Sequence, residues 1–181
     1  TIGKYFINND YIKVSFAECL KQVISIIFGW SIDMLNGYTE ESRIWREKKD
    51  FWWSEKFGYD ITPRYILQHF ATEIMRQHFH EDIWLFTLER HIYNLFIIGQ
   101  TKFVITDMRF INEEKWLKRF KYNHIIQVKR GNFDIDNLTH RSEYEWTKIV
   151  PRFIILNDTT IDNLNKETEK IYKSIIELDK M

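Results

Sequence analysis

The sequence has few of the residues that cross-link a chain or interrupt its helices and strands, with one cysteine, two prolines and six glycines among 181 residues. A single cysteine, Cys19, cannot form an internal disulfide, which fits a reducing compartment. Its place in an apolar helical stretch favours a packed thiol over a nucleophile. A packed core, not covalent cross-links, must therefore hold this chain together.

Charge of one sign and long apolar runs are also missing. The 26 Lys and Arg residues balance the 26 Asp and Glu residues, which removes the simplest argument for a protein that coats nucleic acid. No apolar run approaches the roughly 18 residues of a membrane span, and no signal-peptide layout is present. We therefore expect a soluble, cytoplasmic protein with neither a nucleic-acid partner nor a membrane partner.

Apolar residues are plentiful at 44% of the chain, enough to bury one substantial core. We expect a single domain over residues 1–181. Continuous apolar runs at 103–106, 125–128 and 153–156 are typical of strands covered on two sides. A short strand is also expected at 11–16, and helical patterns at 17–28, 112–120 and 161–178 lie between or after the strands. Helical crossovers between strands predict an α/β fold with a parallel sheet and right-handed connections.

Polar residues follow three of the predicted strands, after Phe16, Thr106 and Leu156. The carboxyl edge of a parallel sheet is where such folds bind ligands. At this edge Asp107 could meet Mg²⁺, and Arg109 could hold a phosphate. An ordinary surface turn after a core strand explains the same pattern.

Thr62 and Pro63 form a helix start, a capping hydroxyl followed by proline at the first helical position. The helix should run to about His78, with an apolar stripe that includes Ile74. Beside it runs a polar stripe with a spacing of four, which either faces solvent or lines a groove for a phosphate and a base; it consists of Arg64, Gln68, Thr72 and Arg76. A second buried helix should follow from Asp82 to about Tyr93, with Phe86 in its core face and Trp84 on another face.

Two segments differ in character from the rest. Residues 30–60 mix charged side chains with tryptophans, which indicates a helical insertion that is either a solvated helix pair or a mobile flap over a substrate. If exposed, Trp45, Trp52 and Trp53 could serve a homodimer. Residues 130–150 are mostly polar and predict a loop or lid over the site.

Short motifs along nearly the whole chain carry a resemblance to a known family. They are, in order, Ser15-Phe16-Ala17 with Leu20-Lys21, residues 26–30, residues 39–43, Thr62-Pro63-Arg64 with Leu67-Gln68, Thr72-Glu73, Arg76, residues 82–84, residues 106–110 with Asn112-Glu113, and Asn157-Asp158. In this order they resemble the deoxynucleoside monophosphate kinases of phages and large DNA viruses. No single tripeptide is specific, but the ordered set is.

The resemblance implies a fold and an activity. The fold is a P-loop NTPase-like three-layer parallel sheet with helices on both faces, a helical substrate-binding insertion and a lid. The activity is transfer of the ATP γ-phosphoryl group to a deoxynucleoside monophosphate with Mg²⁺, in the host cytoplasm if the protein is viral. A nucleotide-binding module without catalysis and a related kinase, such as dephospho-coenzyme A kinase, are the alternatives.

The resemblance also implies roles for individual residues. The catalytic residues would be Asp107, which would orient Mg²⁺ directly or through water, with Arg109, Arg130 and Arg141 on the phosphates. Lid residues His140, Ser142 and Glu143 would order the closed state, and Asn157 and Asp158 would border the adenine of ATP. The acceptor nucleotide would be bound by Ser15, Lys21, Arg43, Arg64, Gln68, Thr72, Glu73, Arg76 and Trp84.

One feature of the family is not found in the sequence. The family begins with a strand and a Gly-rich P-loop, directly before a helix that matches residues 1–7. Lys4 lies inside that helix and cannot take the place of the P-loop lysine. Residues 1–181 are therefore either a fragment of an active enzyme, which we favour, or a protein that has lost its P-loop, and by themselves we expect them to be inactive.

Overall fold

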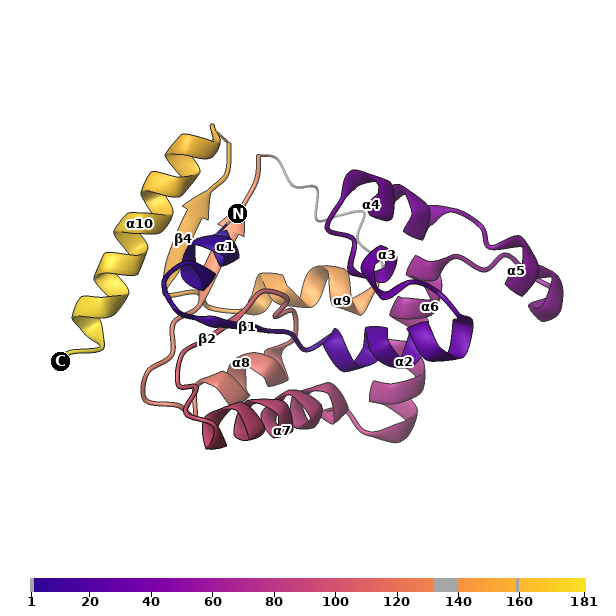
Figure 1. The fold of residues 1–181 in the computed structure, drawn as a ribbon, viewed down its shortest axis with the longest axis horizontal. Coiled ribbons are helices and arrows are strands. Elements are labelled where there is room, and N and C mark those ends of the chain that lie inside the picture. Colours follow the sequence, from indigo (N-terminus) through magenta and orange to yellow (C-terminus); the bar gives the residue numbers. More distant parts are fainter. Residues whose placement is uncertain (1, 132–139, 159) are drawn as a thin grey trace. The chain divides into compact units, whose positions relative to one another are not determined.

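The computed structural model describes residues 2–131, 140–158 and 160–181. The chain divides into two compact units, one formed by Thr1–Ser15 with Tyr93–Met181 and the other by Phe16–Ile92 (Figure 1). The predicted insertion at 30–60 lies inside the second unit. Whether the units form the single domain expected from the sequence stays a prediction.

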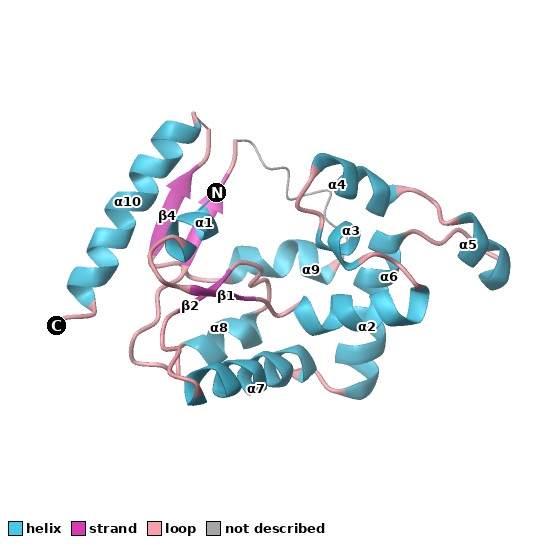
Figure 2. Ribbon diagram, viewed as in Figure 1, coloured by secondary structure: helices cyan, strands magenta, loops and turns pink. Residues whose placement is uncertain are grey.

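The first unit contains all the strands of the described residues, in two parallel pairs (Figure 2). Strand β1 (Ile12–Val14) pairs with β2 (Phe103–Ile105), and β3 (Ile126–Lys129) pairs with β4 (Phe153–Leu156). Each lies where an apolar run predicted it, so the α/β class and the parallel pairing are confirmed. A single three-layer sheet stays a prediction.

The first unit also contains helices. They are α1 (Ile2–Ile7), α8 (Ile111–Leu117), α9 (Arg141–Tyr144), the short 3₁₀ helix η2 (Glu145–Lys148) and α10 (Ile161–Leu178). Helix α1 contacts both β2 and α10, and α10 contacts β4. Edge-to-face aromatic pairs fix α1 against α10, with Tyr5 and Phe6 at 5.7 and 5.8 Å from the Tyr172 ring.

The second unit is helical. Its elements are α2 (Glu18–Phe28), α3 (Ile32–Asn36), α4 (Glu40–Glu47), α5 (Phe51–Phe57), α6 (Pro63–His69), the π-helix η1 (Phe70–Phe79) and the first part of α7 (Ile83–Ile97). One core joins them, built on the buried side chains of Leu20, Ile24, Trp30, Leu35, Ile61, Ile66 and Trp84. The predicted helical insertion is thus present as three short helices that share this core.

Side-chain caps explain why these short helices begin where they do. Thr39 and Ser42 form a capping box at the start of α4, and the Asp50 carboxylate accepts the Trp53 backbone N–H at 3.0 Å at the start of α5. The other Asp50 oxygen accepts the Trp30 indole N–H at 2.8 Å. Asp50 therefore ties the first turn of α5 to the core.

Several expectations about single side chains are wrong. Ile74 and Phe86, predicted in apolar stripes, are exposed, whereas Trp84 is buried. Trp45 packs against Trp30, and the Trp53 indole N–H donates to the Phe28 carbonyl, so of the three tryptophans proposed for a dimer only Trp52 is exposed. The cause is the same throughout: helix periodicity gives the spacing of a stripe, but neighbouring helices decide which stripe is covered.

The region predicted as a loop or lid is partly helical. Residues 141–148 form α9 and η2, with Ser142 and Glu145 buried, while 132–139 lie outside the described residues. Among residues 2–131, 140–158 and 160–181, no helix combines the length and apolar character that a membrane crossing requires.

Candidate functional site

Asp107 and Ser15 meet at the carboxyl ends of two paired strands. Val14, the last residue of β1, lies opposite Ile105, the last residue of β2, so the residues that follow emerge side by side. The Ser15 hydroxyl donates a 2.7 Å hydrogen bond to Asp107 Oδ2. The sheet edge therefore carries a fixed, half-buried carboxylate, as expected of a ligand-binding edge.

Arg109 follows on a loop whose backbone is held by a buried glutamate. The Glu113 side chain is 1% exposed, and its Oε2 accepts the N–H groups of Arg109 at 2.7 Å and Phe110 at 3.1 Å. The Arg109 side chain is exposed, and the described residues offer its guanidinium no hydrogen bond or ion pair. The positive charge of Arg109 therefore faces solvent, while the backbone that carries it is held in place.

Arg141, predicted to act on a phosphate, is engaged within the first unit. It forms an ion pair with Glu145, and its guanidinium lies 5.4 Å from the centre of the Phe110 ring. Glu145 Oε1 also accepts the backbone N–H of Ile111 at 3.1 Å. Burial alone would raise the pKa of the Glu145 carboxyl, but the hydrogen bonds from Arg141 and Ile111 outweigh it and lower that pKa.

The ends of β3 and β4 bring a second set of predicted residues together. The Asn157 N–H donates to the Lys129 carbonyl at 2.7 Å, and the Gly131 N–H donates to the Asp158 carboxylate. Arg130 lies between these two contacts with an exposed side chain. The residues predicted to border the adenine are thus adjacent to one of the predicted catalytic arginines.

The three predicted lid residues lie at the start of α9. His140 Nδ1 accepts the Ser142 backbone N–H at 3.3 Å and lies 2.7 Å from the Ser142 hydroxyl. The Glu143 carbonyl accepts the Trp146 indole N–H at 2.6 Å. These contacts cap and close a short helix and leave the role of the three residues in a closed state as a prediction.

In the second unit, the polar stripe runs from α6 into the π-helix. Arg64 is half-exposed and pairs with Glu47 at 3.3 Å, whereas Thr72 and Arg76 are only 2% and 3% exposed. The Arg76 guanidinium donates to the Glu81 carbonyl at 3.0 Å. The solvated alternative is therefore wrong for the second half of the stripe.

The second half of the stripe lies on a π-helix and not on an α-helix. An α-helix turns through about 400° in four residues, so residues at a spacing of four drift around its axis. A π-helix has wider turns, closed by i→i+5 bonds, and it brings residues at that spacing back toward one line. Such segments are frequent at functional sites. The sequence pattern predicted a continuous α-helix here and gave no sign of the wider turn.

Other predicted acceptor residues lie around this helix pair. Lys21 on α2 donates to the Asn36 side chain at 3.3 Å, and Glu73 lies 3.6 Å from His69. Trp84 is buried and donates its indole N–H to the Ala71 carbonyl at 3.0 Å, which anchors α7 to the π-helix. Arg43 is exposed on α4.

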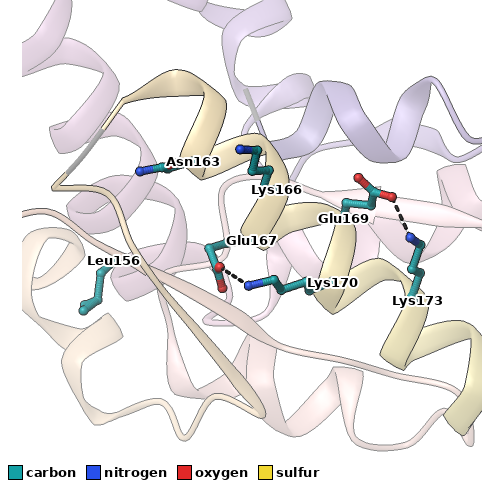
Figure 3. Close-up of a pocket in the computed structure, with 7 residues that line it drawn as sticks. All are labelled: Leu156, Asn163, Lys166, Glu167, Glu169, Lys170 and Lys173. Carbon is teal, nitrogen blue, oxygen red and sulfur yellow. Dashed lines mark hydrogen bonds and ion pairs between the residues drawn. The ribbon is translucent and has the colours of Figure 1, made fainter.

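A pocket of about 630 Å³ lies along α10, near the end of β4 (Figure 3). Three lysines line it, but Lys170 pairs with Glu167 and Lys173 with Glu169 at 2.7 and 2.6 Å. These four side chains are about half to three-quarters exposed. Two of the three lysine charges are offset by glutamates, and no predicted site residue lines this pocket, so it is not the candidate site.

The donors at the sheet edge fit magnesium. Asp107 and Ser15 offer hard oxygen atoms, which Mg²⁺ prefers. Among the described residues no group of three or more His, Cys, Asp and Glu side chains could hold a metal by itself. A single carboxylate suits Mg²⁺, because this ion usually keeps several waters and binds substrate phosphates.

The family assignment agrees with this geometry. A profile of the deoxynucleotide monophosphate kinase family matches residues 6–168. The match includes all four strands, the Asp107 loop and the polar stripe of α6 and η1. The chain therefore belongs to the deoxynucleotide monophosphate kinase family, which is a kinase family of deoxynucleotide metabolism. No curated protein matches the chain significantly.

Sequence reasoning missed the buried glutamates of the first unit. Glu113 and Glu145 both accept backbone N–H groups at the start of α8. A glutamate three residues into a helix is one half of a capping box, so the spacing from Phe110 to Glu113 was a usable signal. Phe110 occupies the N-cap position, where a polar residue is usual, so the capping box was not recognised from the sequence.

Proposed function

We propose that the protein transfers the γ-phosphoryl group of ATP to a deoxynucleoside monophosphate and so forms two diphosphates. The observation that carries this proposal is the family match over residues 6–168. It covers the sheet edge with Asp107 and the helix pair with the polar stripe, the two places where phosphates and an acceptor base would bind.

The catalytic roles follow from where charge develops in phosphoryl transfer. This reaction relies on positioning and charge neutralisation rather than covalent chemistry. The exposed Arg109 guanidinium would grip the acceptor or transferred phosphate. Arg130 and Arg141 would neutralise charge in the transition state, and Arg141 would exchange its Glu145 partner for a phosphate.

Asp107 is the residue that would hold Mg²⁺, directly or through water. Held by this carboxylate, Mg²⁺ would supply positive charge that offsets the charge of the phosphates. Asn157 and Asp158 would border the adenine of ATP. His140, Ser142 and Glu143 would order residues 130–150 as a lid.

The acceptor would lie along the polar stripe of the second unit. Arg64 and Arg76 would bind its monophosphate, since guanidinium groups match phosphate geometry. Side chains of the same unit would shape the base and sugar site; we assign this to Lys21, Arg43, Gln68, Thr72, Glu73 and Trp84.

We further propose that the pairs β1–β2 and β3–β4 belong to one three-layer parallel sheet of the P-loop NTPase type. The described residues provide no strand to join them. Val128, Ile154 and Leu156 are 44%, 52% and 62% exposed, although continuous apolar strands of this kind are usually covered on both faces. A further central strand with its P-loop would cover part of this surface and supply the phosphate-cradling amides.

The test uses the complete gene product with ATP, Mg²⁺ and each deoxynucleoside monophosphate in turn. Formation of ADP and of the deoxynucleoside diphosphate is measured by chromatography. Arg109→Ala should abolish turnover and keep the circular dichroism spectrum, because the described residues give this side chain no structural partner. Lys115→Ala removes an exposed cation from the nearby helix α8 and serves as the control.

The alternatives predict different results. A binding module without catalysis would bind a monophosphate in calorimetry and form no diphosphate. A related kinase would phosphorylate a different acceptor, such as dephospho-coenzyme A, and ignore deoxynucleoside monophosphates. A homodimer is proposed as well; light scattering of Trp52→Ala beside the wild type tests whether the exposed indole contributes to it.

A further inference from the structure

The loop that carries the proposed catalytic residues has two side-chain anchors. We propose that Ser15 and Glu113 are positioning residues that hold residues 106–110 in one conformation, so that Asp107 and Arg109 reach their phosphate and metal partners together. This inference rests on the proposed function. It gives Ser15 a different role from the acceptor-site role expected from the sequence.

The first anchor acts on the Asp107 carboxylate. A carboxylate on a short side chain can rotate, and an oxygen that must meet a metal ion gains from being fixed in advance. The Ser15 hydroxyl fixes Oδ2 through a 2.7 Å charge-assisted bond. Because Ser15 directly follows β1, this contact depends on the parallel register of β1 and β2 and places the donor on a rigid element.

The second anchor acts on the Arg109 backbone. A carboxylate that is 1% exposed is costly unless it is hydrogen-bonded, and Glu113 Oε2 accepts two N–H groups from the loop. These two hydrogen bonds hold the loop backbone without any contact to the Arg109 side chain. The Arg109 backbone is held in place, and its side chain extends into solvent from that position.

Between the anchors, residues 106–110 form neither helix nor strand. Misplacement of a reacting group by about 1 Å can cost a phosphoryl-transfer site 100-fold in rate. Two anchors from two different elements would prevent that misplacement. They also predict separable defects, because one anchor serves the metal ligand and the other serves the phosphate ligand.

The kinetic test compares Ser15→Ala and Glu113→Gln in the complete gene product. Ser15→Ala should raise the Mg²⁺ concentration for half-maximal rate about 10-fold, by analogy with other partners of metal ligands, and leave the KM for the acceptor unchanged. Glu113→Gln should raise the acceptor KM and leave the Mg²⁺ dependence unchanged. Ser15→Thr keeps a hydroxyl and should restore the wild-type Mg²⁺ dependence.

Matched controls are available in the same unit. Ser174→Ala removes a serine hydroxyl that bonds the Lys170 carbonyl at 3.1 Å on α10. Glu114→Gln changes a neighbouring buried glutamate, which accepts the Val150 N–H at 3.3 Å and pairs with Lys118. Both controls should leave the Mg²⁺ dependence and the acceptor KM as in the wild type.

Hydrogen exchange gives a readout that needs no turnover. Amides of residues 106–110 should exchange several-fold faster in Ser15→Ala and Glu113→Gln, and at the wild-type rate in both controls. A wild-type protein that forms no diphosphate would contradict the proposed function, while this exchange result would still decide whether the loop is anchored. An active enzyme whose Ser15→Ala variant has unchanged Mg²⁺ dependence and unchanged exchange would overturn the inference.

Discussion

Glu145 is the residue whose surroundings make the clearest prediction about pH. Its carboxyl is 6% exposed and accepts hydrogen bonds from Arg141 and the Ile111 backbone, and its pKa is lowered from the ordinary 4.5 in spite of burial. A group with a lowered folded pKa contributes its stability above the unfolded pKa and loses it as pH falls through the folded pKa. The contribution should therefore be full at pH 7 and absent in strong acid.

Glu145→Gln tests the pH-dependent contribution of the Glu145 carboxylate to stability. At pH 7 the variant should lose about 2 kcal/mol of unfolding free energy, in the range for hydrogen bonds to charged groups. The difference should shrink as pH falls below 4.5, because the wild type then loses the same interaction. Urea unfolding at pH 7 and at successively lower pH measures it. A difference that stays constant through that range would show that the carboxylate charge does not matter.

At the residue scale, the sequence predicted positions better than contacts. Asp107 and Arg109 do follow a strand, as the apolar run at 103–106 indicated. Ser15 was predicted inside a strand at 11–16, but β1 ends at Val14 and Ser15 follows it. Their partners could not be predicted. The Ser15–Asp107 bond needs the register of β1 on β2, and the Arg141–Glu145 pair needs the fold of residues 140–148, neither of which a local pattern encodes.

Helix α6 is the element with the plainest start signal, and its cap can be measured. The Thr62 hydroxyl accepts the Tyr65 backbone N–H at 3.1 Å ahead of Pro63. Thr62→Ala should lower the free energy of unfolding by about 1 kcal/mol, since one backbone donor loses its partner. Thr101 is exposed on a loop, and Thr101→Ala should change the free energy of unfolding by less than about 0.5 kcal/mol. Equal effects of the two substitutions in urea unfolding would contradict the capping role.

The polar stripe on α6 and η1 makes a functional prediction for the same element. Arg64 is half-exposed and forms a surface ion pair with Glu47, and surface pairs add little to stability, so its removal should spare the fold. Arg64→Ala should raise the KM for the acceptor about 10-fold or more with little change in kcat, the pattern of lost ground-state binding. Glu47→Ala removes the ion-pair partner alone and should leave the acceptor KM within about twofold of wild type, a bound set by the small worth of surface pairs. Equal KM values for Arg64→Ala and the wild type would remove Arg64 from the acceptor site.

Element boundaries were largely predictable because caps, apolar runs and helix spacing are local. Helix α10 and strand β4 lie within a residue of their predicted limits. The π-helix was not predictable, since residues at a spacing of four fit an α-helix as well as a wider turn. The burial of Thr72 and Arg76 depends on the helices packed around them. A pattern within one helix cannot predict that burial.

At the scale of the whole molecule, acceptor binding should stabilise the fold. A ligand that binds only the folded state adds about 2.7 kcal/mol at a concentration of 100 Kd. The melting temperature of the complete gene product should therefore rise with a deoxynucleoside monophosphate, and less so for Arg64→Ala at the same concentration. Scanning calorimetry with and without ligand measures both shifts. No shift with any deoxynucleoside monophosphate would favour a protein without a nucleotide site.

The α/β class and the parallel pairing followed from apolar runs separated by helices. The separation of the strands into two pairs did not, because local sequence says which segments are strands but not how many share one sheet. The division into two units could not be predicted from the composition, which only indicated one core. It gave no boundary at Phe16 or Ile92.

The most direct measurement is the conversion of a deoxynucleoside monophosphate by the complete gene product and by its Asp107→Asn variant. The account predicts equal amounts of ADP and deoxynucleoside diphosphate from the wild type with Mg²⁺. It predicts a loss of about 10³-fold or more in Asp107→Asn, since this carboxylate would hold the ion that neutralises the phosphates. Failure of the wild type to form a diphosphate from any deoxynucleoside monophosphate, or full activity of the variant, would contradict it.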